Sequence, residues 1–443
     1  MTNSFRELIE SCKGNSNSAF RFSKDNNEIS YNRFYSDCIA KKRRISEVPA
    51  DNIVICKDNT YDWIVSFFGT QLAGKTAILL DPGLSSEKIN EICLRYSAVG
   101  LTTDGCLLLS NTGLPQPQIK YKTPISTVIF TSGTEGESKG VALSEKGILS
   151  SVLCSVQRLQ LTENDVIIHV LPFFHAFGLA AEVIATVITK ATLCFGRCLG
   201  TLPKDIDYFS ASVLFAVPSI VKGLFSAKNT ISSLKKIIIG SAAADEEVIS
   251  LIPPNISIYY SYGLSECSPV VALSERNDVY ENKYSGRLLP CCTAIISCDG
   301  EICISGSNVM LGYYDGKKLD RNKIIDGYFH TGDLGYVIED KLFVTGRKKN
   351  ILSFSNGEKI GTEYLEQKIT EHLGVDDCFI WQDDPTSINI ILITSQTIHD
   401  CSIKVSEYLP LGVGINKIRI RTNPILYNAL GKKVRNVCLQ IQC

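Results

Sequence analysis

Short apolar runs alternate with amphipathic segments along most of the chain. Runs bounded by turn-forming residues have the length of buried strands, whereas apolar residues spaced three or four apart favour helices. Strands are predicted at 51–56, 76–80, 166–170, 211–217 and 235–239, and helices at 31–40, 61–72 and 85–96. Strands that alternate with helices pack as largely parallel sheets. The pattern therefore predicts an α/β fold.

After about residue 285 the pattern changes to short strands with close turn signals, followed by a mixed α+β segment. The expected strands are 294–297, 301–305 and 341–345, and beyond 346–349 we expect a helix at 362–373 and strands at 388–393 and 417–420. This change of pattern predicts a large N-terminal domain of α/β subdomains, residues 1–348, with a β-rich lobe at about 285–348. A small α+β domain is expected at 349–443.

Composition and charge argue against some classes of function. The 443 residues are 44% apolar, and 45 basic against 46 acidic side chains give a net charge of −1. A near-neutral chain has no overall field that would recruit nucleic acid or an anionic membrane. The longest apolar stretch, 179–195, contains Glu182 and Lys190, and a bilayer span needs about 20 apolar residues. We therefore expect a buried helix followed by a strand, and no membrane span.

Seventeen cysteines are scattered over the whole length. The segment 1–7 lacks the basic start and apolar core of a secretory leader, which predicts a cytoplasmic protein with reduced thiols that act as small core residues. The closest pairs are Cys194/Cys198 and the adjacent Cys291 and Cys292, and there are only five histidines. Neither pair has zinc-site spacing, so no structural metal is expected.

The strongest chemical signal is a loop rich in Gly, Ser and Thr that follows the strand 127–131 and ends at Lys139. Close-packed backbone N–H groups, hydroxyls and a lysine are suited to phosphate oxygens. Only two residues separate Gly133 and Gly136, so the spacing differs from that of a Walker A loop. Taken alone, the segment also fits a Gly/Ser-rich hairpin.

This loop resembles the phosphate loop of the adenylate-forming superfamily, which includes acyl-CoA synthetases, luciferases and peptide-synthetase adenylation domains. Its pattern there is Thr-Ser-Gly-Ser/Thr-Thr-Gly-x-Pro-Lys-Gly. Further segments resemble family motifs in the family's order: 171–179, 240–244, 260–266, 327–335, 346–349 and 431–435. The resemblance covers nearly the whole chain and is weakest before residue 127. It implies that the domain 349–443 is a mobile lid.

The resemblance also implies a nucleotide site for ATP and Mg²⁺. Tyr262 would stack on adenine, Glu266 would bind Mg²⁺ as a hard oxygen ligand, and Asp333 and Arg347 would hold the ribose. Lys139 would contact the phosphates. The other positions that the resemblance assigns to nucleotide binding are Thr131, Ser132, Gly133, Thr134, Glu135, Gly136, Ser241, Ala242, Ser261, Gly263, Leu264 and Ser265.

For the acyl group, the resemblance implies that Lys432 contacts the carboxylate and the α-phosphate and that Lys349 is the hinge between the domains. The carboxylate pocket would be lined by Phe174, His175, Gly178 and Gly240. Peptide-synthetase domains hold an amino group with an Asp in the segment that corresponds to 171–179. This segment has none, so a carboxylic acid without an amino group is favoured.

The implied function is activation of a carboxylic acid as acyl-AMP, followed by thioester formation with CoA, and the motifs look most like fatty-acyl members. Two other functions stay open. One is transfer of the acyl group to the phosphopantetheine of a separate carrier protein. The other is a nucleotide-binding protein with weak catalysis, because Glu135 and Ser138 replace the usual Thr and Pro and the loop's added negative charge weakens triphosphate binding.

Overall fold

The computed structural model describes residues 3–101, 107–108, 122–131, 139–226, 231–241, 246–276, 278, 284–355, 358–395, 405–409, 413–423 and 425. The chain forms two compact units. The first consists of residues 1–295, 303–330 and 337–342, and the second of residues 296–302, 331–336 and 343–443.

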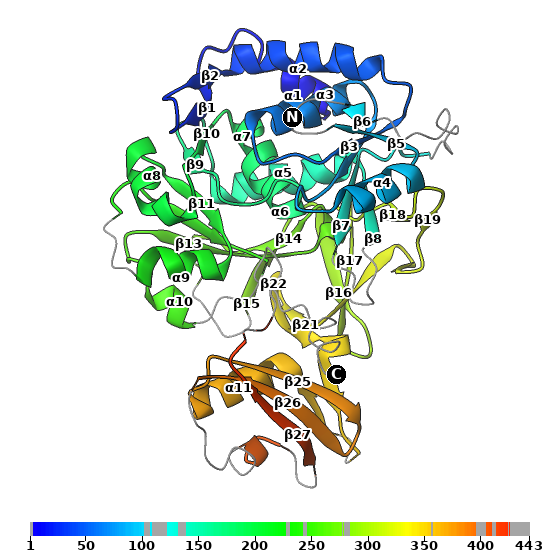
Figure 1. Ribbon diagram of the computed structural model, residues 1–443, viewed down its shortest axis with the longest axis vertical. Helices are drawn as coiled ribbons and strands as arrows, with labels where there is room; N and C mark the ends of the chain where they lie inside the picture. The colour runs from blue at the N-terminus through cyan, green and yellow to red at the C-terminus, as the bar shows by residue number, and fades with distance from the viewer. Residues whose placement is uncertain are drawn as a thin grey trace. The chain divides into compact units, whose positions relative to one another are not determined.

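The larger sheet of the first unit is mostly parallel from β15 to β2, and beyond β15 it continues into β22 (Lys341–Arg347), β21 (Tyr328–Ile338), β17 (Glu301–Gly306) and β16 (Cys292–Ile296) (Figure 1). The strands from β15 to β2 are β1 (Ser18–Phe22), β2 (Glu28–Ser30), β9 (Val166–Ile168), β10 (Thr192–Phe195), β11 (Val213–Ala216), β12 (Lys236–Ile239), β13 (Ser257–Gly263), β14 (Val270–Leu273) and β15 (Tyr284–Leu288). They follow the order β15-β14-β13-β12-β11-β9-β10-β1-β2. From β13 to β1 all neighbours are parallel, whereas β2, β14 and β15 pair antiparallel.

Both faces of the strands β11 and β12 are covered by helices. One face packs against α8 (Leu202–Phe209), α9 (Pro218–Ser226) and α10 (Glu246–Ser250), which Figure 1 shows along this side of the sheet. Leu214 and Ile237 point into that core. Because side chains alternate along a strand, Phe215 and Ile238 face the other side, where they line a cavity beside α5 (Glu145–Leu159). Such double coverage is typical of parallel sheets.

A second sheet has the order β19-β18-β8-β7-β4-β3-β5-β6. Its strands are β3 (Asn52–Ile55), β4 (Thr76–Leu79), β5 (Ala98–Leu101), β6 (Leu107–Leu108), β7 (Thr127–Thr131), β8 (Lys139–Leu143), β18 (Gly312–Tyr314) and β19 (Leu319–Asp320). The helix α4 (Ser86–Arg95) packs its buried residues Ile92 and Cys93 on this sheet. The helices α1 (Phe5–Glu10), α2 (Tyr31–Ser46) and α3 (Tyr61–Leu72) complete this part of the unit.

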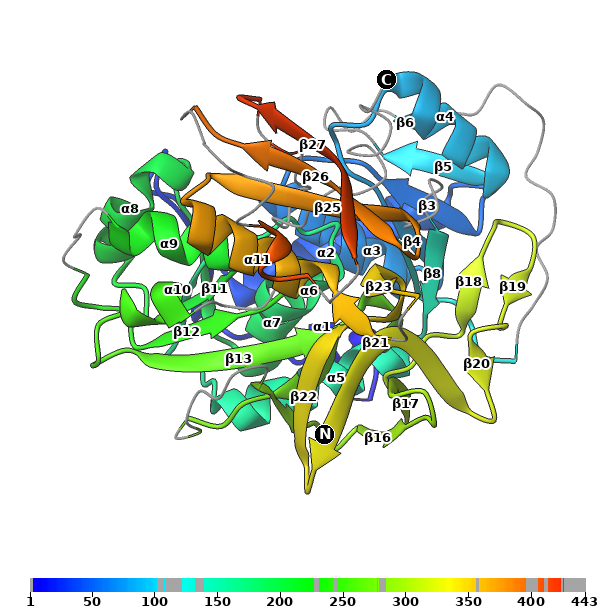
Figure 2. The same cartoon turned by 90° about the horizontal axis from the view of Figure 1, so that it is seen from below.

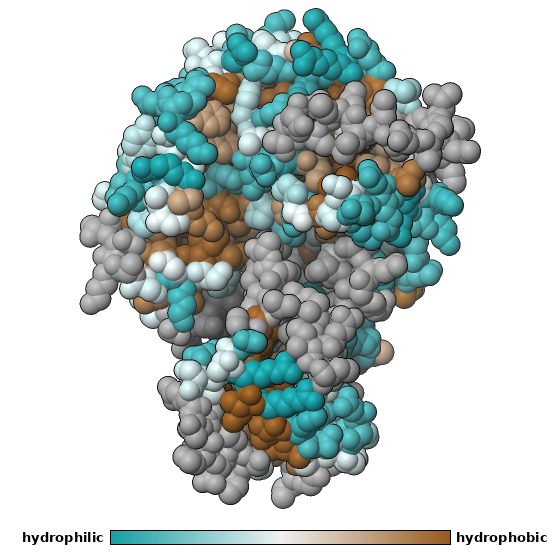
Figure 3. All heavy atoms as spheres, viewed as in Figure 1, coloured by the Kyte–Doolittle hydropathy of each residue, from teal (hydrophilic) through white to brown (hydrophobic). Residues whose placement is uncertain are grey.

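The helices α1 to α5 each begin at a serine or threonine whose side chain accepts a backbone N–H, as at Ser30 before α2, Thr60 before α3 and Ser144 before α5. Such caps satisfy amide groups that have no partner within the helix. The helix α2 continues past the predicted end at residue 40 to Ser46. The polar and basic residues after 40 lie mostly on the solvent side of the helix. The outward side of α2 is largely hydrophilic (Figure 3).

The strands β16 (Cys292–Ile296), β17 (Glu301–Gly306), β21 (Tyr328–Ile338) and β22 (Lys341–Arg347) contribute residues to both units, and β20 (Ile324–Ile325) pairs with β21. The rest of the second unit contains β23 (Ile351–Ser353), β24 (Lys359–Gly361), α11 (Thr362–Leu373), β25 (Asp377–Asp384), β26 (Ser387–Ile393) and β27 (Gly414–Arg421). The last three strands form one sheet, and α11 packs on it through Leu365 and Ile369 (Figure 2).

The predicted α/β fold is confirmed. The helices predicted at 61–72 and 362–373 occur with those bounds, and the apolar stretch 179–195 forms buried helical segments followed by β10. None of the helices in the described part of the chain has the length and apolar character that a membrane span requires.

Candidate functional site

The residues predicted to surround the nucleotide's adenine lie at the carboxyl ends of neighbouring parallel strands. In the register of β11, β12 and β13, Ala216 is paired with Ile239 and Ile239 with Tyr260. The segments that follow, which contain Gly240 and Ser261, therefore begin at the same edge of the sheet. In open α/β sheets, ligands bind outside this edge.

The chain bends at Ser241, shortly after β12. A Cβ atom at Gly240 would lie 3.0 Å from the ring of Phe177, so the ring packs on the glycine backbone. Ser241 has a φ of +69°, in the left-handed region that residues other than glycine rarely occupy. Such backbone conformations persist where surrounding structure enforces them, and they cluster at ligand sites.

In the segment from Tyr262 to Glu266, at the end of β13, two stretches of backbone pack closely against each other at Gly263. A Cβ atom at Gly263 would lie 1.9 Å from the carbonyl oxygen of Pro269, so only glycine fits. The amide of Leu264 donates to the same carbonyl at 2.9 Å. A short 3₁₀ turn from Ser265 to Cys267 follows and carries Glu266.

Lys139 and Glu266 come together around Tyr313. Lys139 is the first residue of β8 and is paired with Thr131, the last residue of β7. Its Nζ atom lies 5.5 Å from the centre of the Tyr313 ring, within cation–π distance. The hydroxyl of Tyr313 donates to Glu266 Oε1 at 2.9 Å. Burial raises the pKa of Tyr313 well above its usual value, and the charge of Glu266 raises it further.

Five residues predicted for the phosphate loop lie between these two strands but outside the described residues: Ser132, Gly133, Thr134, Glu135 and Gly136. The described ends of the loop, Thr131 and Lys139, are register partners. The loop is therefore the connection of an antiparallel strand pair. Ala242 and Lys432 also lie outside the described residues.

The predicted carboxylate-pocket residues Phe174, His175 and Gly178 follow β9 at the same sheet edge. The rings of Phe174 and His175 lie 4.6 Å apart, and His175 begins the short helix α6 (Ala176–Gly178). A Cβ atom at Gly178 would lie 2.1 Å from the carbonyl oxygen of Pro172. This close approach folds the loop back onto α6 and places Phe177 against Gly240.

A buried carboxylate that the sequence analysis did not assign to the site holds this loop. Glu182 lies in a π-helical turn (Leu179–Ile184) and is fully buried. Its Oε1 accepts the amides of Val170 and Leu171, each at 3.0 Å, and its Oε2 lies 2.5 Å from His169 Nδ1. The signal was present in the sequence as the single acid in the stretch Leu179–Thr189. Its partners are visible only in the fold.

A small apolar cavity of about 20 Å³ lies next to these residues, between α5, the π-helical turn and β11–β14. Phe177 and Ser261 both line it, which connects the predicted carboxylate pocket with the strand that carries Tyr262. The lining residues are Val152, Ser155, Val156, Leu159, Leu161, Phe177, Ala180, Ala181, Ala185, Phe215, Ile238, Ser261, Val270 and Leu273. None of them is charged. The contribution of α5 was not predicted from the sequence.

The two residues predicted for the ribose form an ion pair in the second unit. Asp333 lies in β21 with its side chain 4% exposed, and its Oδ1 is 2.8 Å from Arg347 Nε. The Thr331 hydroxyl accepts the amide of Asp333 at 3.0 Å and donates to the Ile302 carbonyl at 2.7 Å. These contacts fix the carboxylate beside the guanidinium. Lys349, the predicted hinge, is exposed in a short 3₁₀ turn (Lys348–Asn350) that follows β22.

The carboxylate of Glu266, the predicted Mg²⁺ ligand, is a hard oxygen donor of the kind that Mg²⁺ prefers. Within the described ranges, no group of three or more His, Cys, Asp or Glu side chains forms a metal cage.

Comparison with known proteins identifies the family. A family model described as "AMP-binding enzyme" matches residues 11–314, more than half of the chain. A probable 4-coumarate–CoA ligase 3 of Dictyostelium discoideum is 32% identical over 338 residues, which cover 68% of this chain and 59% of that protein. The chain therefore spans about three fifths of the length of this relative.

Solved structures with the same fold include ATP-bound MatB from Rhodopseudomonas palustris, with a TM-score of 0.85 and 19% identity over 99% of this chain and 98% of that one. The o-succinylbenzoate–CoA synthetase MenE from Bacillus subtilis, in complex with ATP and magnesium, matches with a TM-score of 0.82 and 20% identity over 98% of this chain and 99% of that one. At these identities the likeness concerns the fold.

Proposed function

The chain belongs to the family of AMP-binding enzymes, and from that premise we propose that it is an AMP-forming acid–thiol ligase. It activates a carboxylic acid with ATP as acyl-AMP and then forms a thioester with CoA. The observation that carries the proposal is the grouping of Lys139, Tyr313 and Glu266. It joins a phosphate-binding cation and a metal-binding carboxylate through one aromatic side chain.

In the first step an oxygen of the acid attacks the α-phosphorus of ATP, and the bond to pyrophosphate breaks. Lys139 and the loop that begins at Thr131 bind the phosphates that leave, so their charge is stabilised as it develops. Glu266 would hold Mg²⁺, which would supply further neutralisation of phosphate charge. Tyr262 stacks on the adenine. The protein thus contributes positioning and charge stabilisation, as is general for phosphoryl chemistry.

In the second step the thiol sulfur attacks the acyl carbonyl, AMP leaves and the thiol proton is released. We assign Lys432 to the first step only, where it contacts the carboxylate and the α-phosphate. Asp333 accepts hydrogen bonds from the ribose hydroxyls with Arg347 beside it. Lys349 is the hinge of a mobile domain, residues 349–443, whose rotation separates the two steps. These assignments rest on the family motifs in which the residues stand.

We propose an acid with an apolar body, such as a fatty or aryl acid. The cavity beside Phe177 and Ser261 is lined by apolar side chains and two serines. A second carboxylate or an ammonium group there would lose its hydration without gaining an ion partner, which costs several kcal/mol. This argues against dicarboxylic and amino acids. His175 and Phe174 would form the wall next to the reacting carboxylate.

The experiment is ATP–pyrophosphate exchange with fatty, aryl and dicarboxylic acids, repeated with CoA present. We expect exchange with apolar acids and consumption of CoA. Exchange without CoA consumption would instead favour a carrier-protein acceptor, tested with a phosphopantetheinylated carrier. Measurable ATP binding without exchange for any acid would contradict the ligase proposal and favour a nucleotide-binding protein. Glu266→Gln is the matched variant, because it keeps the shape of the side chain and removes its charge.

A further inference from the structure

Most of the described cysteines are the core residues that the sequence analysis predicts. Cys56, Cys93 and Cys194 are buried and reduced, and burial raises their pKa values to about 11, about 11 and about 12. Thiols with raised pKa values are poor nucleophiles at neutral pH. A set of three other cysteines is arranged differently.

Cys154, Cys291 and Cys292 form a cluster of thiols in the first unit. The Cys291 thiol interacts with the thiols of Cys154 and Cys292, and these interactions shift the pKa values of all three. Cys154 lies on α5, whereas Cys291 and Cys292 lie where β16 begins. Cys154 and Cys291 are both only partly buried. The thiol cluster is separate from the residues assigned to the ligase reaction.

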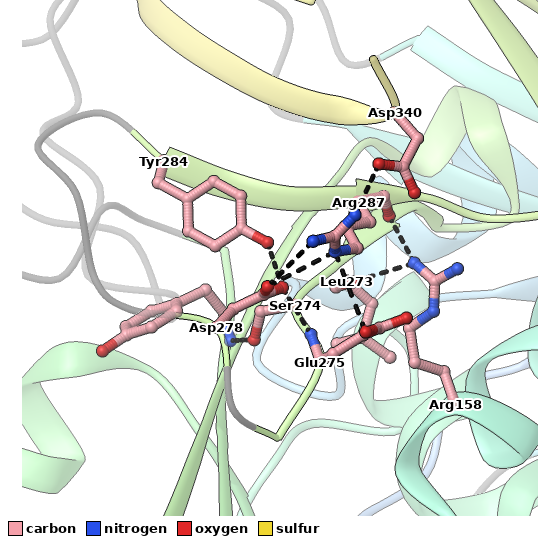
Figure 4. A network of polar contacts seen from close by, with 9 residues as sticks. Arg158, Leu273, Ser274, Glu275, Asp278, Tyr284, Arg287 and Asp340 are labelled. Carbon is pink, nitrogen blue, oxygen red and sulfur yellow. Dashed lines mark hydrogen bonds and ion pairs between the residues drawn. The ribbon is translucent and has the colours of Figure 1, made fainter. Parts of the chain in front are cut away.

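The fold holds the cluster from both sides. Ser150, one turn before Cys154 on α5, accepts the hydroxyl of Ser307 at 2.9 Å. The amide of Ser307 donates to the Cys291 carbonyl at 3.1 Å. One turn after Cys154, Arg158 donates through one nitrogen to the carbonyls of Leu273 and Arg287 at 3.0 and 2.8 Å (Figure 4).

Arg287 is itself fixed, because it pairs with Asp278 at 3.3 Å and with Asp340 at 2.7 Å, and Tyr284 also donates to Asp278 (Figure 4). The Arg158 end of α5 is therefore anchored to the strand β15. The face of α5 that carries Cys154 is thus held against the segment that carries Cys291.

The surroundings give the thiols of Cys154 and Cys291 different pKa values. The hydrogen bond from Cys291 lowers the pKa of Cys154 despite partial burial, and the positive charge of Arg158 lowers it further. The same hydrogen bond, together with that to Cys292, raises the pKa of Cys291. Because the thiolate is the reactive form, the lowered pKa favours Cys154 as the nucleophile of the pair.

Geometry also selects the partner. Consecutive Cα atoms lie about 3.8 Å apart, below the usual range of about 4.4–6.8 Å for a disulfide, so a link between Cys291 and Cys292 is strained. Cys292 Sγ is directed at the carbonyls of Val271 and Leu289, at 3.4 and 3.5 Å. The favoured partner of Cys154 is therefore Cys291.

We propose that Cys154 and Cys291 form a peroxide-sensitive thiol pair that closes into a disulfide between α5 and the segment before β16. The Cys154 thiolate attacks hydrogen peroxide, the O–O bond breaks, and sulfenic acid and hydroxide form. The sulfur of Cys291 then attacks the sulfenic sulfur, the S–O bond breaks, and water leaves with the Cys291 proton. Two thiols lose two electrons in total, and one peroxide becomes two waters once the hydroxide takes up a proton.

The test treats the full-length protein with limiting hydrogen peroxide at pH 7, blocks the remaining thiols under denaturing conditions and maps the peptides by mass spectrometry. We expect a reducible link between the peptides of Cys154 and Cys291, with a mass loss of two hydrogen atoms. Cys292→Ser should keep the link. Cys291→Ser should lose it and leave a sulfenic acid at Cys154 that dimedone traps.

Cys198 provides the matched control, since it is exposed, its hydroxyl neighbour Thr201 lowers its pKa, and it lies apart on another segment. Cys198→Ser should leave the Cys154–Cys291 link unchanged. A link between Cys291 and Cys292 in the wild-type protein would overturn the proposal. So would sulfinic acid at Cys154 with Cys291 still reduced, or oxidation of Cys198 while both thiols of the pair stay reduced. Because the mapping uses the wild-type chain, the result stands even if a variant fails to fold.

Discussion

His169 Nδ1 lies 2.5 Å from Oε2 of Glu182, a carboxylate that is fully buried in a π-helical turn. The other oxygen accepts two backbone amides from the loop that leads to His175. A buried charge is costly unless every oxygen is hydrogen-bonded. π-Helical turns are frequent at functional sites. This contact therefore fixes the loop that forms the wall of the proposed carboxylate pocket.

Glu182→Gln should raise the KM for the acid more than the KM for ATP. The glutamine keeps the shape of the side chain but weakens its hydrogen bonds with the backbone of the loop. The loss of a charged acceptor should cost about 1.5–3 kcal/mol of unfolding free energy. Denaturant unfolding and separate KM values for the two substrates measure both effects. Glu163→Gln, at an exposed position, is the control and should change stability by less than about 0.5 kcal/mol. Equal changes in both KM values would rule out a positioning role.

Tyr313→Phe should slow acid-dependent pyrophosphate exchange by about three- to tenfold, the equivalent of one hydrogen bond of about 1 kcal/mol. The variant removes the hydroxyl that binds Glu266 but keeps the ring beneath Lys139. Tyr313→Leu should be slower still. Tyr314→Phe is the neighbouring control, since its hydroxyl binds the Gly316 carbonyl. If both phenylalanine variants slow the exchange equally, the link between Tyr313 and the reaction is wrong.

Gly240→Ala should raise the KM for the acid, because the added Cβ atom would lie 3.0 Å from the Phe177 ring and push it toward the cavity. Gly223→Ala is the matched control on the exposed surface of α9, where a Cβ atom meets open space. It should stabilise the protein by about 0.5–1 kcal/mol. Acid titrations of both variants test this, and an unchanged KM in Gly240→Ala would contradict the proposed pocket.

Asp62→Asn should destabilise the protein at neutral pH by about 1–3 kcal/mol, since it leaves the buried ammonium group of Lys57 without its carboxylate. Lys41 also contacts Asp62, at 2.6 Å. Burial pushes the pKa of Asp62 upward, but hydrogen bonds from the two lysines outweigh it and lower the pKa below the usual 3.8.

A carboxylate with a depressed pKa stabilises the fold above the unfolded pKa and loses that contribution as the pH falls through the folded one. The difference in unfolding free energy between wild type and Asp62→Asn should therefore be constant above about pH 5 and shrink below the unfolded pKa of 3.8. Urea unfolding between pH 2 and 7 measures it. A difference that grows on acidification would have the opposite sign to this account.

Lys432→Ala should abolish acid-dependent pyrophosphate exchange while it largely spares thioester formation from supplied acyl-adenylate. The reason is that the proposed role of Lys432 is confined to the first step. Lys433→Ala, next to it in the chain, is the control and should retain both steps. Equal loss of the two steps in Lys432→Ala would disprove the assignment.

The hydrophobic periodicity predicted the helices and strands, and the sequence motifs predicted the family. Strands such as β12 and helices such as α3 depend on burial of their own side chains at a regular period, which a single sequence displays. Gly178 and Gly263 could also be predicted as motif residues, and the fold supplies the physical reason, since a Cβ atom at either one would collide with a backbone carbonyl. The matched family and the α/β fold confirm that part of the analysis.

The contacts around Glu182, Tyr313 and Cys154 were decided by the tertiary structure. Tyr313 meets Lys139 because β18 pairs with β8, and its hydroxyl meets Glu266 because the turn after β13 lies alongside. Cys154 lies near Cys291 because Ser307 links the two segments, through the Ser150 hydroxyl on α5 and the Cys291 carbonyl. These side chains are distant in sequence, and no periodic pattern encodes which of them will touch. The sequence by itself determined which chemical groups the protein carries, and only the packing of sheets and helices decided which groups act together.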